Sequence, residues 1–318
     1  MMPGQGADPW ALTADNASTL LKRRAAALAT IRAYFAEQRV LEVETPLLRR
    51  FASNDYQLDS LVVHPLERAS QHFEDRYLAT SPEVAMKQLL SLGSGSIFQL
   101  CKAFRDDPPS RLHAREFTML EWYRVGFTLQ ELMNDVAALV NRLLPARHVA
   151  FYSYRQLFID RLSIDPLVAP IEELQALARA HIDLQMTSTN RDAWLDVLLT
   201  HCLEPELGRD ELAFVYGYPA SQAAMAELDT SRDVPVALRF ELYIEGVEMA
   251  NGYQELTDAE EQKRRLLADN DRRQREGKQP LAIDEQLLAA LARGLPTCAG
   301  VALGVDRLLS LAGQSETG

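Results

Sequence analysis

The sequence is poor in the residues that build metal centres and disulfide scaffolds. Its 318 residues include three cysteines and six histidines, and none of them stands at the spacing of a zinc site. The odd, widely separated cysteines argue against a disulfide framework and predict reduced thiols in a cytoplasmic protein. No apolar run approaches the roughly 20 residues that span a bilayer. The first residues also lack the basic and apolar segments of a secretory signal.

Positive charge is scarce as well. Lys and Arg number 33 against 45 Asp and Glu, so the formal net charge at pH 7 is -12. Broad binding to nucleic acid requires many cations and is therefore disfavoured, whereas a small basic pocket is compatible with this balance. Two common catalytic motifs are also missing from the sequence, the Gly-Lys-Ser/Thr phosphate loop and the Gly-x-Ser-x-Gly nucleophile turn.

Hydrophobic periodicity predicts a chain of mixed helices and strands, an α+β protein. Residues 1–17 are expected to form a flexible tail. The helix that starts at residue 81 carries three start signals, with Ser81 as cap, Pro82 at the first helical position and Glu83 near the positive end. The expected helices cover residues 18–38, 81–92, 128–145, 171–180, 190–201 and 258–278, and the expected strands cover 40–46, 61–64, 77–79, 116–123, 239–245, 247–255 and 300–307, the last leading into a helix.

A strand, a basic loop and a second strand are predicted over residues 104–123. Four cationic side chains gather in this stretch of an acidic chain, namely Arg105, Arg111, His113 and Arg115. A local cluster of cations predicts an anionic ligand such as a nucleotide phosphate. The alternative is a solvated surface hairpin, because charged turns are common.

Carboxylates supply a second signal. Glu241, Glu248 and Glu255 recur every seven residues along a predicted hairpin with its turn at Glu245–Gly246. Glu241 and Glu248 then lie on paired strands, where two like charges are unfavourable unless a cation separates them. Oxygen ligands near phosphates indicate Mg²⁺. The alternative is a row of solvated glutamates.

An amine site is the third prediction. Glu121 and Tyr123 share one face of the strand at 116–123. Together with Glu83 or Glu255 they could hold a cationic substrate through charge-assisted hydrogen bonds.

In this order, the segments resemble the three signature motifs of class II aminoacyl-tRNA synthetases. The helix that ends at 40–46 looks like the first motif, 104–123 like the second and 300–307 like the third. Residues 116–121 and 251–256 are similar to the lysyl branch. The resemblance covers roughly residues 19–311 and implies an antiparallel sheet flanked by helices, a catalytic domain over 18–318, and a homodimer.

Within that branch, the chain is similar to free-standing paralogues of lysyl-tRNA synthetase. The matching segments are 80–87, 98–105, 116–123, 219–222 and 300–307. The resemblance implies ATP-dependent, AMP-forming activation of lysine or (R)-β-lysine as an aminoacyl adenylate, and its transfer to a lysine side chain of elongation factor P. The predicted core starts within about 20 residues of the first Met, which leaves no room for an anticodon-binding domain. Binding of tRNA is therefore not expected.

Two other functions stay open. One is a stand-alone ligase with another acceptor, including an ammonia-dependent asparagine synthetase, although an aspartate substrate would call for cations where Glu121, Tyr123 and Glu255 stand. The other is a non-catalytic paralogue that only senses ATP or amino acids.

The resemblance also implies roles for individual residues. Arg105 and Arg307 are the expected catalytic residues, and Phe117 and Arg307 are expected to sandwich adenine. The expected ATP-binding residues are Arg105, Asp106, Asp107, His113, Ala114, Phe117, Glu248, Met249, Gly304 and Arg307. The expected amino-acid-binding residues are Ser81, Pro82, Glu83, Glu121, Tyr123, Asn251, Glu255 and Ala302, and Glu241 and Glu248 are the expected Mg²⁺ ligands.

Several positions depart from the pattern of the tRNA synthetases, among them Arg115, which stands where the family has Pro. Asp107 stands where the family has Glu and is one methylene shorter. Ala114 replaces an asparagine and cannot supply its hydrogen bond. Ala302 replaces a glycine, and its methyl group reshapes the floor of the expected pocket, although one methyl discriminates by only about 1–3 kcal/mol.

Overall fold

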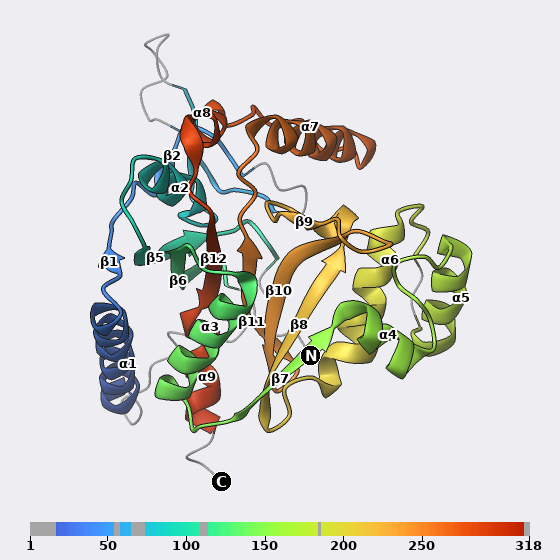
Figure 1. The fold of residues 1–318 in the computed structure, drawn as a ribbon, viewed down its shortest axis with the longest axis horizontal. Coiled ribbons are helices and arrows are strands. Elements are labelled where there is room, and N and C mark those ends of the chain that lie inside the picture. The colour runs from blue at the N-terminus through green and yellow to red at the C-terminus, as the bar shows by residue number, and fades with distance from the viewer. Residues whose placement is uncertain (1–16, 54–57, 65–73, 109–113, 184–185, 315–318) are drawn as a thin grey trace. The chain divides into compact units, whose positions relative to one another are not determined.

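A computed structural model describes residues 17–53, 58–64, 74–108, 114–183 and 186–314, with residues 312–314 described by their backbone only. The chain divides into two compact units, Met1–Gly126 with Thr257–Gly318, and Phe127–Leu256. Each unit contains an antiparallel-rich sheet with helices packed against it, which confirms the α+β expectation (Figure 1). Of the tail predicted for residues 1–17, only Ala17 is among the described residues, and it belongs to the first helix.

The first unit is built on a sheet in the order β1-β5-β6-β12. β6 runs antiparallel to both β5 and β12, whereas β1 runs parallel to β5. A smaller antiparallel sheet has the order β2-β4-β3, and α2 packs beside α8 (Figure 1). The strands are β1 Leu41–Glu42, β2 Leu48–Arg49, β3 Val62–Val63, β4 Arg76–Leu78, β5 Ile97–Phe104, β6 Glu116–Val125 and β12 Cys298–Gly304. The helices are α1 Ala17–Glu37, α2 Glu83–Ser91, α7 Ala259–Arg275, α8 Glu285–Gly294 and α9 Val305–Gln314.

The helix predicted over 18–38 is confirmed to within one residue by α1. Its apolar stripe packs on the sheet because Phe35 stacks on Phe98, with ring centroids 4.3 Å apart, and meets Trp122 edge-on at 5.4 Å. Burial of such aromatic pairs is a large part of what stabilises a core. The start of the helix is different, since Leu20 and Leu21 are 38% and 48% exposed.

The second unit contains a sheet in the order β11-β10-β8-β7, with β9 paired to β10. β7 runs parallel to β8, and the other pairs are antiparallel. The strands are β7 His148–Ser153, β8 Glu211–Pro219, β9 Leu228–Asp229, β10 Val236–Ile244 and β11 Val247–Gln254. The helices are α3 Leu129–Leu143, α4 Tyr154–Leu162, α5 Ile171–His181, α6 Arg191–Leu198, a π-helical turn Leu199–Leu203, and 3-10 turns Glu204–Glu206 and Ala220–Gln222.

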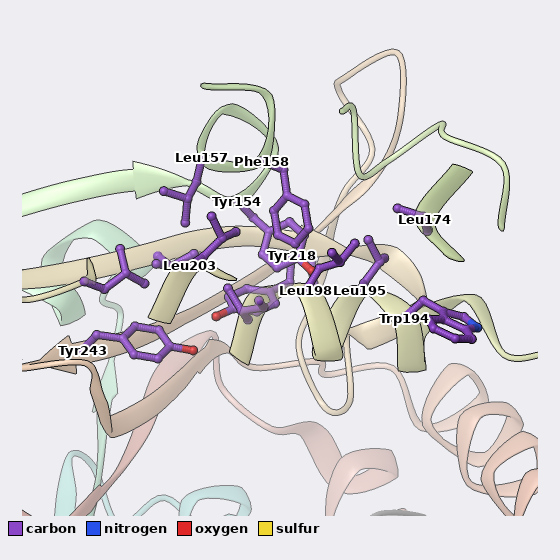
Figure 2. Close-up of a cluster of buried hydrophobic side chains, with 14 of the residues drawn as sticks. Tyr154, Leu157, Phe158, Leu174, Trp194, Leu195, Leu198, Leu203, Tyr218 and Tyr243 are labelled. Carbon is purple, nitrogen blue, oxygen red and sulfur yellow. The ribbon is translucent and has the colours of Figure 1, made fainter. Parts of the chain in front are cut away.

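The core of the second unit lies between its sheet and helices α4 and α6. Tyr154 stacks on Phe158 and lies tilted against Tyr218, with ring centroids 4.7 Å apart in both pairs (Figure 2). Trp194 and Leu195 of α6 are buried in the same cluster. Interleaved aromatic and aliphatic side chains of this kind give the sheet and its helices one continuous apolar interior.

The turn predicted at Glu245–Gly246 is confirmed, and it joins β10 to β11. Both residues have positive φ angles, 51° and 72°, as a two-residue hairpin turn of the I′ type requires. The backbone amides of Glu245 and Gly246 donate to the carbonyls of Gly208 and Leu207, at 2.9 and 2.8 Å. Asn251–Gly252, a dipeptide that often forms such hairpin turns, lies inside β11 and not at a turn.

One predicted strand is too long. Of residues 40–46 only Leu41–Glu42 forms a strand, although Val43 still donates to Phe98 at 2.8 Å. Pro46 lacks an N–H group, so pairing cannot continue through it. β7, α4 and β8 were not predicted at all.

Candidate active site

Arg105 stands immediately after β5, where the hairpin opens into the predicted phosphate loop. The amide of Arg105 donates to the carbonyl of Arg115 at 3.0 Å, which closes the hairpin at this point. The Arg105 guanidinium lies over the Phe117 ring, 5.2 Å from its centroid. Its Nε is buried and has no hydrogen-bond acceptor among the described residues. A buried cationic donor of this kind fits an oxygen of an anionic ligand.

The acidic residues of this loop are held by a cation within the loop. Arg115 forms an ion pair with Asp106 at 3.3 Å and donates to the carbonyl of Asp107 at 3.4 Å. Arg115 therefore compensates the charge of Asp106, whereas Arg105 keeps its buried Nε donor unused. Ala114 is half-buried. Arg111 and His113 lie outside the described residues.

Arg307 lies in the first turn of α9, three residues after the end of β12 at Gly304. The atoms nearest to a Cβ built on Gly304 belong to the Arg307 side chain, the first of them 3.6 Å away, which is an ordinary contact. Packing within the described chain therefore does not require glycine here. The position fits the expected close approach of a ligand to the backbone beside Arg307.

Glu121 occupies the middle of the first unit's sheet. Its neighbours across the strands are Gln99 on β5 and Ala302 on β12. It is 2% exposed, and Tyr123 donates its hydroxyl to Oε1 at 2.6 Å. Oε2 is buried without a partner among the described residues.

The ionisation of Glu121 reflects this setting. Burial, and then the negative charge of Glu83, raise the pKa of Glu121 to about 8, against hydrogen bonds from Tyr123 and Ser81 and the charge of Lys87. A cation bound beside Glu121 would stabilise the ionised form and lower this pKa, which makes Glu121 a candidate cation-binding group.

Helix α2 brings Glu83 and Lys87 to the same region. Lys87 is 1% exposed and donates to Glu83 Oε1 at 2.6 Å. The Ser81 hydroxyl accepts the Glu83 amide at 3.0 Å, but the predicted cap is wrong by one residue, because Pro82 stands at the N-cap and Glu83 at the first helical position. The carboxyl groups of Glu83 and Glu121 thus have one internal ammonium nearby, that of Lys87. A second positive charge, such as that of a ligand, would balance the pair.

In the second unit, Glu241 and Glu248 lie on paired strands as predicted, but they are not opposite each other. A register shift between Leu242 and Tyr243 places Glu241 opposite Asn251 and Glu248 opposite Tyr243. Such irregularities are common beside binding sites because they redirect side chains.

The Glu241 carboxylate is held by three donors. Tyr218 and Tyr243 donate their hydroxyls to Oε2 at 2.6 and 2.5 Å, and Arg239 donates to Oε1 at 2.5 Å. Burial, and then the charges of Glu241 and Glu248, raise the pKa of a further carboxyl, Glu204, to about 7. Negative charge is therefore concentrated here beyond what Arg239 neutralises.

These oxygens suit Mg²⁺ better than a softer metal. Among the described residues, no group of three or more His, Cys, Asp and Glu side chains is arranged to hold a metal ion. Mg²⁺ prefers one or two carboxylates together with water and substrate phosphates, so a pair such as Glu241 and Glu248 fits it.

The remaining predicted residues lie along β11 and at its end. Met249 and Glu255 are each 2% exposed. Asn251 has its Oδ1 buried without a partner in the described part of the chain. An unsatisfied buried acceptor fits a donor on a ligand.

Sequence reasoning overlooked the residues that support these carboxylates. Lys87 has a recognisable signal, since it stands four residues after Glu83 on one helix face. Arg239 and Tyr243 flank Glu241 at two-residue spacing, which puts them on the same face of β10. Tyr218 and Glu204 come from other elements, and no pattern in the sequence points to them.

The family profile described as tRNA synthetases class II (D, K and N) matches residues 10–317. The chain belongs to this family of class II tRNA synthetases, which confirms the predicted fold class. In the described residues, no helix has the length and apolarity to cross a membrane.

Several curated proteins resemble the chain along nearly its whole length, and each is named elongation factor P--(R)-beta-lysine ligase. The protein from Pectobacterium atrosepticum is 44% identical over 298 residues, 93% of this chain and 91% of that protein. The protein from Yersinia pestis (strain Pestoides F) is 45% identical over 299 residues, with the same coverage. The protein from Mannheimia succiniciproducens is 44% identical over 289 residues, 91% and 89% of the two chains.

Proposed function

We propose that the protein is an ATP-dependent, AMP-forming ligase that activates lysine or (R)-β-lysine and transfers it to a lysine side chain of elongation factor P. The observation that carries the substrate class is the buried Glu121 carboxyl, which has an unpartnered oxygen and a pKa of about 8. A substrate ammonium supplies the missing charge and donors. The names of the relatives support the acceptor.

In the first step, a carboxylate oxygen of the amino acid attacks the α-phosphorus of ATP, and pyrophosphate leaves. Arg105 stabilises the charge that develops on the phosphate, since its buried Nε has no other described acceptor. Phe117 and Arg307 hold the adenine ring from its two faces. Asp106, Asp107, Ala114, Met249 and the backbone at Gly304 complete the proposed nucleotide contacts, together with His113, which lies outside the described residues.

Glu241 and Glu248 would hold Mg²⁺, which neutralises charge on the phosphates when it is bound. The two tyrosine hydroxyls and Arg239 fix the orientation of the Glu241 carboxylate. A ligand held in one orientation contributes more to a metal site than a mobile one.

The substrate amine is held by acidic side chains, by residues that orient them and by further polar groups. Glu83 and Glu121 provide charge, Tyr123 orients Glu121, and Ser81 and Pro82 set the start of α2. Asn251 and Glu255 provide further polar contacts by the family pattern, and Ala302 lies next to Glu121 across the strands.

In the second step, the ε-amine of the acceptor lysine attacks the carbonyl carbon of the aminoacyl adenylate. An amide bond forms, AMP leaves, and the amine loses its proton. No covalent bond to the enzyme is required, so positioning and charge neutralisation carry the rate.

We further propose that residues 18–318 act as one catalytic domain in a homodimer. The exposed apolar side chains of Leu20, Leu21 and Leu41 on α1 and β1 would gain from being covered by a second copy. The three described cysteines are free thiols, which supports the proposed cytoplasmic location.

Exchange of labelled pyrophosphate into ATP tests the first step, with lysine, (R)-β-lysine and aspartate supplied in parallel. We expect exchange with lysine or β-lysine, and transfer of label from the amino acid to purified elongation factor P. Exchange with aspartate alone would exclude the lysyl assignment, and no exchange with any of them would favour a non-catalytic paralogue.

Arg105→Ala should abolish exchange while leaving the melting temperature unchanged, because it removes the phosphate donor from a half-buried position. Arg50→Ala is the matched control. Arg50 also lies over a phenylalanine ring, 5.7 Å from the centroid of Phe51, but belongs to an exposed ion pair with Glu74. Near-normal exchange in Arg105→Ala would show that the phosphate is anchored elsewhere.

A further inference from the structure

A network of three side chains joins α1, β6 and α9 within the first unit. Arg24 of α1 donates to Asp306 Oδ1 through one guanidinium nitrogen and to Thr118 Oγ1 through the other, both at 2.5 Å. Asp306 Oδ2 accepts the backbone amide of Thr118 at 2.6 Å. Both carboxylate oxygens of Asp306 and both terminal nitrogens of Arg24 are therefore used between residues 282 positions apart.

The network lies where a sheet ladder ends. β6 and β12 pair up to Met119 and Gly304, after which β12 gives way to α9. The next residue on β6, Thr118, still pairs with Lys102 of β5 but has no partner on β12, and the Asp306 carboxylate accepts its amide in place of a backbone carbonyl. Asp306 thus fixes the first turn of α9 against β6, and its negative charge also suits the start of a helix.

Two proposed adenine-binding residues are the chain neighbours of this network. Phe117 directly precedes Thr118, and Arg307 directly follows Asp306. The bond between Thr118 and Asp306 therefore determines how the backbones of Phe117 and Arg307 stand relative to each other. Arg24 holds that bond in place, because a guanidinium that bridges both partners restricts the rotation of the Asp306 side chain.

We propose that Arg24 is a positioning residue for ATP, which acts through Asp306 and Thr118 to set the separation of Phe117 and Arg307. Arg24 itself touches no reacting atom. The inference rests on the proposed function, in which these two side chains hold the adenine ring. It gives α1 a role in nucleotide binding that its contacts with the sheet core alone do not imply.

The test is the ATP dissociation constant, measured by equilibrium dialysis, together with the KM values for ATP and lysine in pyrophosphate exchange. Loss of charge-assisted hydrogen bonds should weaken ATP binding by Arg24→Ala about tenfold and raise the KM for ATP equally. The KM for lysine should stay within about twofold, because the Glu83 and Glu121 region is not part of the network. A variant that merely loosened the fold would change both KM values.

Arg32→Ala is the matched control, since Arg32 is on the same helix and pairs with Glu42 at 3.0 Å in an exposed position. It should bind ATP like the wild type.

Arg24→Lys keeps the charge but not the two-pronged geometry, so its ATP affinity should lie between those of the wild type and Arg24→Ala. Thr118→Val removes the hydrogen bond between Arg24 and the Thr118 hydroxyl without changing the size of the side chain. In the double variant Arg24→Ala/Asp306→Asn, the loss should be no larger than in the worse single variant, as expected for groups that act as a unit.

The inference is overturned if Arg24→Ala and Thr118→Val bind ATP as tightly as Arg32→Ala does. It is also overturned if the effects of Arg24→Ala and Asp306→Asn simply add. Wild-type protein that binds ATP without exchanging pyrophosphate would contradict the proposed function instead, and the ratio of ATP affinities would still decide the role of Arg24.

Discussion

In the proposed amine site, Glu121 is the side chain whose ionisation would control the binding of a cationic substrate. Burial and the neighbouring charge of Glu83 raise its pKa to about 8, so the group holds a proton near neutral pH. An ammonium ion binds the ionised form. Below pH 8 the ionised fraction of a group with this pKa increases about tenfold for each pH unit.

We therefore predict that the KM for lysine falls as the pH rises from about 6 to 8, by up to about tenfold per unit, and levels off above. Pyrophosphate exchange at a series of pH values and lysine concentrations measures it. The direction follows from the sign of the shift, since a raised carboxyl pKa delays ionisation to higher pH. Glu121→Gln should give a high KM that no longer changes across this window, and a wild-type KM independent of pH would contradict the assignment.

At the same scale, Glu241 shows what a sequence can and cannot reveal. Its spacing from Glu248 and the turn at 245–246 were enough to predict two carboxylates on paired strands. The register shift after Leu242 and the hydroxyl of Tyr218 could not be predicted, because both depend on how β8 and β11 pair with β10. Spacing therefore identified the residue, but not the donors that orient it.

Among the elements, the β10–β11 hairpin depends on a close backbone approach at Gly208. A Cβ at Gly208 would lie 2.4 Å from the Tyr243 carbonyl oxygen and 2.6 Å from Ile244 Cα, distances that real side chains do not adopt. Its φ of 72° adds strain for any residue with a side chain. The same glycine accepts the amide of Glu245 at the hairpin turn.

Gly208→Ala should therefore lower the free energy of unfolding by more than about 3 kcal/mol, through backbone displacement in addition to φ strain. Gly277→Ala is the control, because its φ is 78° and nothing lies within 4 Å of an added Cβ. It should cost only about 1 kcal/mol. Urea denaturation measures both, and equal losses would show that the approach of Gly208 to β10 is not tight.

Elements with local signals were predictable, and elements with distant partners were not. The helix α3 is confirmed within two residues of its predicted limits, since Thr128 and Glu131 form a capping box at its start. β8 is an almost uninterrupted apolar run, Glu211–Pro219, and periodicity cannot distinguish such a run from a buried helix. Its parallel partner β7 is about 60 residues earlier in the chain, a separation at which no turn motif marks the pairing.

For the whole molecule, the charge balance argues against tRNA as a partner. A net charge of -12 repels a polyanion, whose binding draws its affinity mainly from Lys and Arg at the phosphates. We predict a dissociation constant for lysine tRNA weaker than about 10 µM in physiological salt, measured by filter binding. Binding tighter than about 1 µM, with a steep dependence on salt, would show that a basic surface has been overlooked.

The proton on Glu121 also bears on selectivity against inorganic ions. A permanently ionised pair of buried carboxylates would attract inorganic cations such as K⁺ as well as an ammonium. With a pKa of about 8, the Glu121 carboxyl is mostly neutral at pH 7, and the Glu83 charge is already matched by Lys87. Potassium donates no hydrogen bonds and offers the carboxyl little in exchange for its proton. An amino group offers both charge and directed donors, so the proposed amine site would select an ammonium over simple inorganic cations.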